Sequence, residues 1–205
     1  MARDEERRER AEESPIVGGL PDVPGILVAM RLAPGLAVHL RGLADALLVD
    51  DFPGATLTRA ERELVATAVS AGNDCFYCMD SHGAFAGELL LRETGDRGDA
   101  VVAAVKLGGS DGLGEKLAAL LHIARKVQRR GRDLTADDVA RARTAGASDG
   151  DVQLAVLIAS AFCMYNRMVD GLRAKTPPSE DAFRPRAIEI ASHGYSDPRV
   201  GAVPR

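Results

Sequence analysis

The sequence contains no tryptophan, and only three tyrosines and five phenylalanines among its 205 residues. It also has no excess of positive charge, because its 26 lysines and arginines are outnumbered by 30 aspartates and glutamates. A protein that binds the phosphate backbone of DNA or RNA usually carries such an excess. We therefore expect no nucleic-acid partner.

Segments that would direct the chain to a membrane or out of the cell are lacking as well. No apolar run approaches the roughly 18 residues that a membrane-spanning helix needs. Residues 1–14 are charged throughout, where a secretory signal would need an apolar stretch. We therefore expect a cytoplasmic protein with no membrane partner, and in that compartment a structural disulfide would be unusual.

Convincing strand alternation is absent, whereas alanine and leucine, which favour helices, dominate the composition. The sequence thus predicts an all-α fold. We expect residues 1–14 to form a disordered charged N-terminal tail and residues 15–205 to form a single helical domain. The apolar helix faces exceed what one layer needs, so some of them are expected to meet another copy of the chain.

What the sequence does contain is a Cys-x-x-Cys pair, Cys75 and Cys78, followed four residues later by His82. On a helix with 100° per residue, these three side chains fall within an arc of about 60°. The dipole at a helix start favours a thiolate at Cys75, whereas His82 favours one at Cys78 by accepting its proton. The residues alone leave open which sulfur attacks.

A break between two helices is predicted just before the pair. One helix is expected to end at Gly72, and Asp74 is expected to cap a second helix that begins at or beside Cys75. Such a break favours an antiparallel helix pair. The first helix carries a polar stripe of Glu63, Thr67 and Ser70 that would face the second helix. In this stripe, Thr67 and Ser70 would support the carboxylate of Glu63.

Together these residues suit the reduction of a peroxide. Glu63 can orient His82, and His82 can accept a proton from a thiol. One thiolate would attack the peroxide oxygen and become a sulfenic acid, and the other thiol would condense with it to a disulfide. A dithiol reductant of the lipoamide or thioredoxin type would then restore the pair. This cycle needs neither a cofactor nor a metal.

Other interpretations of the pair stay open. The cysteines can be small core residues, or they can join Glu63 and His82 as zinc ligands, although a structural zinc site usually adds a second pair of ligands elsewhere. A redox sensor or dithiol oxidoreductase would use the pair without efficient peroxide turnover. The third cysteine, Cys163, lies in an apolar run and is interpreted as a buried small side chain.

The pattern E-x11-C-x2-C-x3-H of residues 63–82 resembles the alkylhydroperoxidase D-like (AhpD-like) family of the carboxymuconolactone decarboxylase superfamily. The form Cys-x-Tyr-Cys, with Tyr77, is similar to its peroxidase-related branch, as are residues 166–167 and 193–195. The best-understood members carry a histidine in place of Tyr77. A phenol is a poor base, but it can donate a hydrogen bond, so we expect Tyr77 to support the site.

The resemblance implies an AhpD-like helical bundle that assembles as a dimer or a trimer of dimers, and a thiol-dependent peroxidase activity. It implies that Cys78 meets the peroxide and that Cys75 is its disulfide partner. It also implies that Glu63 and His82 form a proton relay. A decarboxylase-like or ligand-binding member without redox chemistry is a further alternative. The physiological peroxide, the reductant and the parts played by Asn166 and Arg167 do not follow from the sequence.

Overall fold

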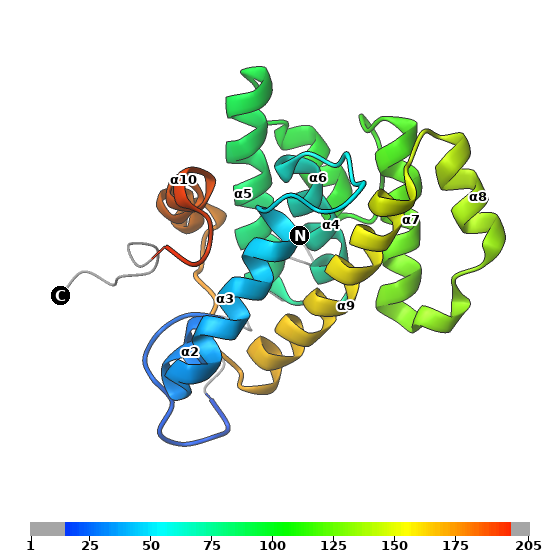
Figure 1. Ribbon diagram of the computed structural model, residues 1–205. Coiled ribbons are helices and arrows are strands. Elements are labelled where there is room, and N and C mark those ends of the chain that lie inside the picture. Colours follow the sequence, from blue (N-terminus) through cyan, green and yellow to red (C-terminus); the bar gives the residue numbers. More distant parts are fainter. Residues whose placement is uncertain (1–14, 198–205) are drawn as a thin grey trace.

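The computed structural model describes residues 15–197, and these residues form a bundle of helices without a β-strand (Figure 1). The predicted all-α fold is thus confirmed for this part of the chain. The expected N-terminal tail, residues 1–14, and the last residues, 198–205, lie outside the described residues.

The helices follow one another along the described part of the chain. In order they are α2 (Leu27–Leu32), α3 (Pro34–Leu48), α4 (Arg59–Gly72), α5 (Phe76–Thr94), α6 (Asp99–Lys106), α7 (Glu115–Arg130), α8 (Ala136–Thr144), α9 (Asp149–Gly171) and α10 (Arg184–His193). Two short 3-10 helices, η1 (Gly131–Asp133) and η2 (Glu180–Phe183), precede α8 and α10.

Helices α4, α7 and α9 form the centre of the bundle, and each of them packs against the other two. Their facing sides are apolar, and Val65, Leu121 and Ile158 have no exposed surface. The start of α9 is fixed by a capping box of Ser148 and Asp151. Helix α9 is therefore a central element of the bundle, with most of its apolar side chains buried.

We expected no segment long and apolar enough to cross a membrane, but helix α9 meets that description by its length and composition. More than half of its most apolar stretch is buried against the rest of the bundle. A largely buried apolar helix is what the core of a soluble protein contains, and the capping box at its start fits that setting.

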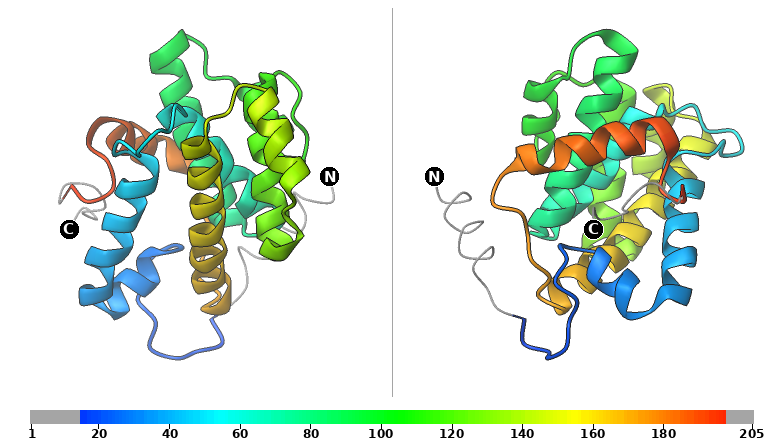
Figure 2. Two further views of the ribbon diagram at one scale, coloured as in Figure 1. Left: turned by 45° about the vertical axis from the view of Figure 1, so that its right-hand side comes forward. Right: turned by 90° about the vertical axis from the view of Figure 1, so that its left-hand side faces the viewer.

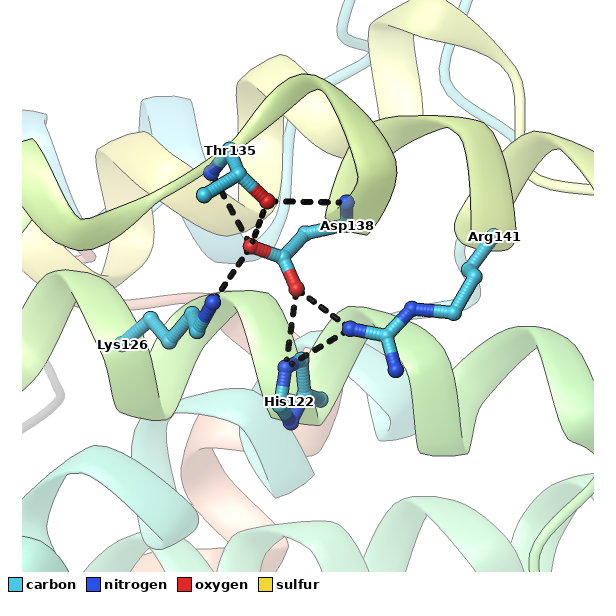
Figure 3. A network of polar contacts seen from close by, with 5 residues as sticks. All are labelled: His122, Lys126, Thr135, Asp138 and Arg141. Carbon is cyan, nitrogen blue, oxygen red and sulfur yellow. Dashed lines mark hydrogen bonds and ion pairs between the residues drawn. The ribbon is translucent and has the colours of Figure 1, made fainter.

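One buried carboxylate, Asp138, holds the junction between α7 and α8 (Figure 3). It accepts hydrogen bonds from Lys126 Nζ at 2.6 Å and Thr135 Oγ1 at 2.7 Å, and it lies 3.0 Å from His122 Nε2. Arg141 completes the group with an ion pair. The hydrogen bond from Lys126, followed by those from Thr135, holds the pKa of Asp138 well below its ordinary value. This cluster is structural and lies at the end of the bundle that α8 forms.

The turn between α4 and α5 places the cysteine pair. Helix α5 has Cys75 as its N-cap, so the prediction that Asp74 caps this helix is wrong. Asp74 instead adopts a left-handed backbone conformation with φ 53°, which a short polar residue tolerates in a tight turn. The backbone N–H of Cys75 donates to the carbonyl of Ser70 at 3.0 Å, which fastens the turn to the last part of α4.

The chain that follows α10 is fastened to α3. Figure 2 shows α10, in orange and red, lying across the side of the bundle with its red end near α3. The backbone N–H groups of Tyr195 and Ser196 donate to the carboxylate of Asp45 at 2.6 and 2.8 Å. This anchor brings Tyr195 to the side of α5 that carries the cysteine motif, since its ring packs against that of Phe85.

Candidate active site

The two cysteines of the motif lie at the start of α5, and both are reduced and buried. Cys75 has no exposed surface, and Cys78 retains 3% of its own. A hydrogen bond with Cys78 is the largest cause that raises the pKa of Cys75 above its ordinary value. Burial and the negative charge of a Cys78 thiolate raise it further.

This result opposes the helix-dipole argument, which by itself favours a thiolate at Cys75. The Cys75 sulfur lies out of water and beside a second sulfur, and a second negative charge there would be repelled by the first. Burial and the neighbouring thiol thus both oppose a thiolate at Cys75.

Glu63 and His82 lie together, as the sequence predicts, although they come from different helices. His82 Nδ1 is 2.6 Å from Glu63 Oε2, and Glu63 is buried. When a carboxylate accepts the hydrogen bond of Nδ1–H, the Nε2 atom of a neutral imidazole is left to accept a proton. The His82 ring packs edge-on against Phe85 and Phe162, with centroid distances of 5.2 and 4.6 Å. These contacts fix its orientation.

Tyr195 completes this group, although the sequence alone did not place it in the site. Tyr195 Oη donates to Glu63 Oε1 at 2.6 Å and lies 3.4 Å from His82 Nδ1. Burial, then the charge of Glu63 and the hydrogen bond to it, raise the pKa of Tyr195 well above its ordinary value. Tyr195 therefore stays protonated and holds the second carboxylate oxygen. Its only signal in the sequence is its place in the family-like segment 193–195.

Thr67 and Ser70 lie on the stripe with Glu63, and both are fully buried. The Thr67 hydroxyl donates to the backbone carbonyl of Glu63 at 2.8 Å. Ser70 accepts a hydrogen bond from Asn166 Nδ2 at 3.1 Å and, through its carbonyl, one from the turn before α5. These two residues thus bond to the scaffold of the site rather than to the sulfur atoms.

Asn166 joins α9 to the turn between α4 and α5. Its Oδ1 atom accepts a hydrogen bond from Asn73 Nδ2 at 2.8 Å, and Asn73 Oδ1 accepts one from Gln128 at 2.8 Å. Cys163 lies 3.6 Å from the same Asn73 nitrogen and is half-buried, so the interpretation of a fully buried side chain is wrong. Arg167 is exposed and donates to the Cys163 carbonyl within its own helix.

Tyr77, which stands between the two cysteines in the sequence, is buried. Its ring packs edge-on against that of Phe183, with a centroid distance of 5.3 Å. Burial raises the pKa of Tyr77 to about 12. The phenol is therefore no base near neutral pH, and it acts as an apolar wall with a polar tip. The backbone of Gly25 closes over the ring so tightly that a Cβ atom there would lie 2.2 Å from it.

A cavity of about 50 Å³ opens in front of Cys78 and His82. Tyr77 and Tyr195 belong to its wall, which is mostly apolar, and two arginines complete it. A single water needs roughly 10–15 Å³, so the cavity has room for about three waters or for the end of a small organic molecule. Within residues 15–197, no group of three or more His, Cys, Asp or Glu side chains is arranged to hold a metal ion.

Residues 39–126, which include the whole motif of residues 63–82, match the model of the carboxymuconolactone decarboxylase family. Comparison with curated proteins gives no match. A solved structure from Ralstonia eutropha JMP134, described as an alkylhydroperoxidase AhpD core and an uncharacterized peroxidase-related protein, is 26% identical with a TM-score of 0.66. The comparison covers 79% of this chain and 80% of that chain.

A second solved structure, an uncharacterized peroxidase-related protein from Silicibacter sp. TM1040, has the same fold. It is 22% identical with a TM-score of 0.63, and the comparison covers 80% of this chain and 90% of that chain. The family match lies on the segment that carries the cysteines, and both structures extend the likeness over most of the bundle. Residues 39–126 thus resemble the carboxymuconolactone decarboxylase family, and most of the chain shares the fold of the solved alkylhydroperoxidase AhpD core.

Proposed function

We propose that the protein is a thiol-dependent peroxidase that reduces hydrogen peroxide or organic hydroperoxides at Cys78. The observation that carries this proposal is the hydrogen-bonded group of Glu63, His82 and Tyr195, which stands beside a cavity that Cys78 lines. The raised pKa of Cys75 adds to it, because a protonated Cys75 leaves Cys78 as the sulfur that ionises.

In the first step, His82 accepts the proton of Cys78, and Glu63 stabilises the resulting imidazolium through Nδ1–H. The Cys78 thiolate attacks the terminal oxygen of the peroxide, and the O–O bond breaks with both of its electrons leaving on the other oxygen. His82 returns the proton to this leaving alkoxide or hydroxide. The products are a sulfenic acid at Cys78 and an alcohol or water.

In the second step, the thiol of Cys75 attacks the sulfur of the sulfenic acid. An S–S bond forms, the S–O bond breaks, and the Cys75 proton leaves with the hydroxyl group as water. Cys75 and Cys78 belong to one buried cluster at the start of α5, so the attacking sulfur stands near its target before any peroxide arrives. An external dithiol, of the lipoamide or thioredoxin type, then restores both thiols by exchange.

The wider setting of this chemistry is also part of the proposal. The contact of Glu63 with His82 supports antiparallel packing of α4 and α5, because the two residues lie at similar distances along the chain on either side of the turn that joins these helices. We further infer a homo-oligomer, a dimer or a trimer of dimers, working in the cytoplasm. Its exposed apolar side chains on α3, such as Val38 at 70% exposure, support such an assembly.

The test is consumption of hydrogen peroxide and tert-butyl hydroperoxide with dihydrolipoamide, and separately with a thioredoxin system, as reductant. Cys78→Ser should abolish consumption, and Cys75→Ser should stop it after about one equivalent, with a sulfenic acid that dimedone traps. Cys163→Ser is the matched control and should retain turnover. Glu63→Gln should lower the rate about 10²-fold or more, within the usual range for a lost proton relay.

Three outcomes would contradict the proposal. Full turnover in Cys78→Ser would remove the assigned sulfur from the reaction. Oxidation of the wild type that stops after one equivalent with every dithiol would instead identify a redox sensor. Unchanged ligand binding or decarboxylation after both thiols are alkylated would indicate a member of the superfamily without redox chemistry.

A further inference from the structure

Asn166 is a polar residue in the largely apolar helix α9, and the proposed peroxide chemistry gives it no part. Only 1% of its surface is exposed. It is not among the described residues that line the cavity in front of Cys78. Burial of an amide is unfavourable unless its donor and acceptor atoms are hydrogen-bonded, so the partners of Asn166 indicate its purpose.

Both polar atoms of the Asn166 side chain bond to the end of α4. Nδ2 donates to Ser70 Oγ at 3.1 Å, and Oδ1 accepts a hydrogen bond from Asn73 Nδ2 at 2.8 Å. Ser70 is fully buried in the last turn of α4, and Asn73 is the C-cap of that helix. One side chain from α9 thus holds the last helical turn and the residue that leaves it.

This end of α4 also determines where Cys75 lies. The Ser70 carbonyl accepts the backbone N–H of Cys75 at 3.0 Å. Cys75 is the N-cap of α5 and has extended backbone angles, whereas Cys78 lies inside the helix. A shift of the turn would therefore move the sulfur of Cys75 relative to that of Cys78, because only Cys78 has a fully helical backbone to hold it.

The groups that serve Cys78 are held by other contacts. Glu63 bonds to His82 and Tyr195, at 2.6 Å in each case, and it lies about two helical turns before Ser70 on α4. The His82 ring is fixed by Phe85 and by a phenylalanine of α9. Loss of the Asn166 contacts should thus disturb Cys75 more than the activation of Cys78.

We propose that Asn166 is a positioning residue for Cys75 and that it sets how well the site resists overoxidation. The inference rests on the proposed peroxidase function and concerns the regulation of its site. After the first step, Cys75 can attack the sulfenic acid at Cys78, which forms the disulfide and releases water. The placement of Cys75 governs the rate of this attack, since a misplacement of about 1 Å can slow a reaction by about 10²-fold.

A second peroxide molecule competes with Cys75 for the sulfenic acid. The sulfenate sulfur attacks the peroxide oxygen, a new S–O bond forms, and the O–O bond breaks with both electrons leaving on the other oxygen. The sulfenic acid proton passes to this leaving oxygen. The products are a sulfinic acid, which dithiols do not reduce, and an alcohol or water. A well-placed Cys75 protects the site because it keeps the first route faster.

The partition between these two routes can be measured in Asn166→Ala. Reduced protein is mixed with hydrogen peroxide and quenched at set times with acid and N-ethylmaleimide, and mass spectrometry then counts disulfide and sulfinic acid. We expect the first equivalent of peroxide to be consumed within about twofold of the wild-type rate, and disulfide formation to slow about tenfold or more. Because the routes compete, sulfinic acid should appear at Cys78 at about tenfold lower peroxide concentration.

Ser148→Ala is the matched control, because it removes the N-cap of the same helix at its other end and should leave the partition unchanged. Asn73→Ala removes one partner of Asn166 at a half-buried position, so it should shift the partition in the same direction even where Asn166→Ala does not fold. A wild-type partition in the folded variant of Asn166 or Asn73 would overturn the inference. An equal shift in Ser148→Ala would do so too, since it would reduce the effect to general destabilisation.

Titration against reduced and oxidised glutathione separates this inference from the function on which it rests, since it needs no peroxide. The disulfide should be about tenfold less stable in Asn166→Ala, which raises its potential by about 30 mV. That shift, in a protein whose wild type consumes no peroxide, would support the positioning role and refute the peroxidase. Wild-type turnover, with neither titration nor partition altered in Asn166→Ala, would leave the peroxidase standing and refute the inference.

Discussion

The contact between Gly25 and Tyr77 gives the sharpest test of how the wall of the active site is built. Gly25 has φ +56°, and a Cβ atom added to it would lie 2.2 Å from Cε1 and Cζ of Tyr77 and 2.3 Å from Cδ1. Ordinary contacts of this kind are about 3.5–4.0 Å. In Gly25→Ala, the ring or the segment before α2 must therefore move by more than about 1 Å.

The ring itself cannot yield easily. Tyr77 is buried and packs against Phe183, and the backbone N–H of Gly25 is bonded to the carbonyl of Lys175 at 3.0 Å. The left-handed conformation costs alanine about 1–2 kcal/mol, and overpacking of a buried site adds about 1–3 kcal/mol. We expect Gly25→Ala to lower the free energy of unfolding by about 2–5 kcal/mol, a large share of the roughly 5–15 kcal/mol of a typical domain.

Urea unfolding of Gly25→Ala beside Gly19→Ala isolates the steric part of this cost. Gly19 has φ +74°, and no atom lies within 4 Å of a Cβ built on it, so this control carries the backbone strain alone. The two variants should differ by about 1–3 kcal/mol. The segment before α2 should also lift from Tyr77, and iodoacetamide should then label Cys78 faster in Gly25→Ala. Equal stability of the two variants, with labelling of Cys78 at the wild-type rate, would refute this reasoning.

Two further predictions concern the buried polar groups of the site. Tyr195→Phe leaves Glu63 Oε1 without its donor and should cost about 1–3 kcal/mol in urea unfolding, with slower peroxide turnover; an unchanged value of both would remove Tyr195 from the relay. The free energy of unfolding should fall as the pH rises from about 9 to about 12, because the pKa of Cys75 is raised in the folded chain and that of Tyr77 is raised to about 12. The unfolded chain then loses these protons at lower pH than the folded chain does. Urea unfolding followed by circular dichroism at a series of pH values measures how steeply the free energy of unfolding falls with pH. Cys75→Ser should make this dependence less steep.

Local signals in the sequence were sufficient for most of the helices. The capping boxes of α4, α8 and α9 are signals of this kind, because each depends on two residues three positions apart in the sequence. The pairing of Glu63 with His82 was also predictable, since helical spacing and one helix break determine it. Asp74 was assigned wrongly for a related reason. A residue with a strong capping tendency stands beside the helix start, but the turn takes it into the left-handed region and leaves the cap to Cys75.

The features that sequence patterns missed depend on contacts between distant segments. The part played by Tyr195 needs α10 to return to α5, 132 residues along the chain from Glu63. The raised pKa of Cys75 needs its complete burial, which a local dipole argument leaves out. Arg41 and Arg186 lie on separate helices, and only the folded chain brings them to one cavity. Spacing rules cover one or two helical turns, so none of these could be read from a motif.

The contact between α3 and the end of α10 joins the wall of the cavity to the hydrogen-bonded group beside Cys78. Helix α3 carries both Arg41, at the cavity, and Asp45, which holds the backbone N–H groups of Tyr195 and Ser196. Helix α10 carries Arg186 and leads directly to Tyr195. One packing interface thus sets the distance between the two arginines and the position of the hydroxyl on Glu63. A shift of α10 against α3 would therefore move the wall of the cavity and the Tyr195 hydroxyl on Glu63 together.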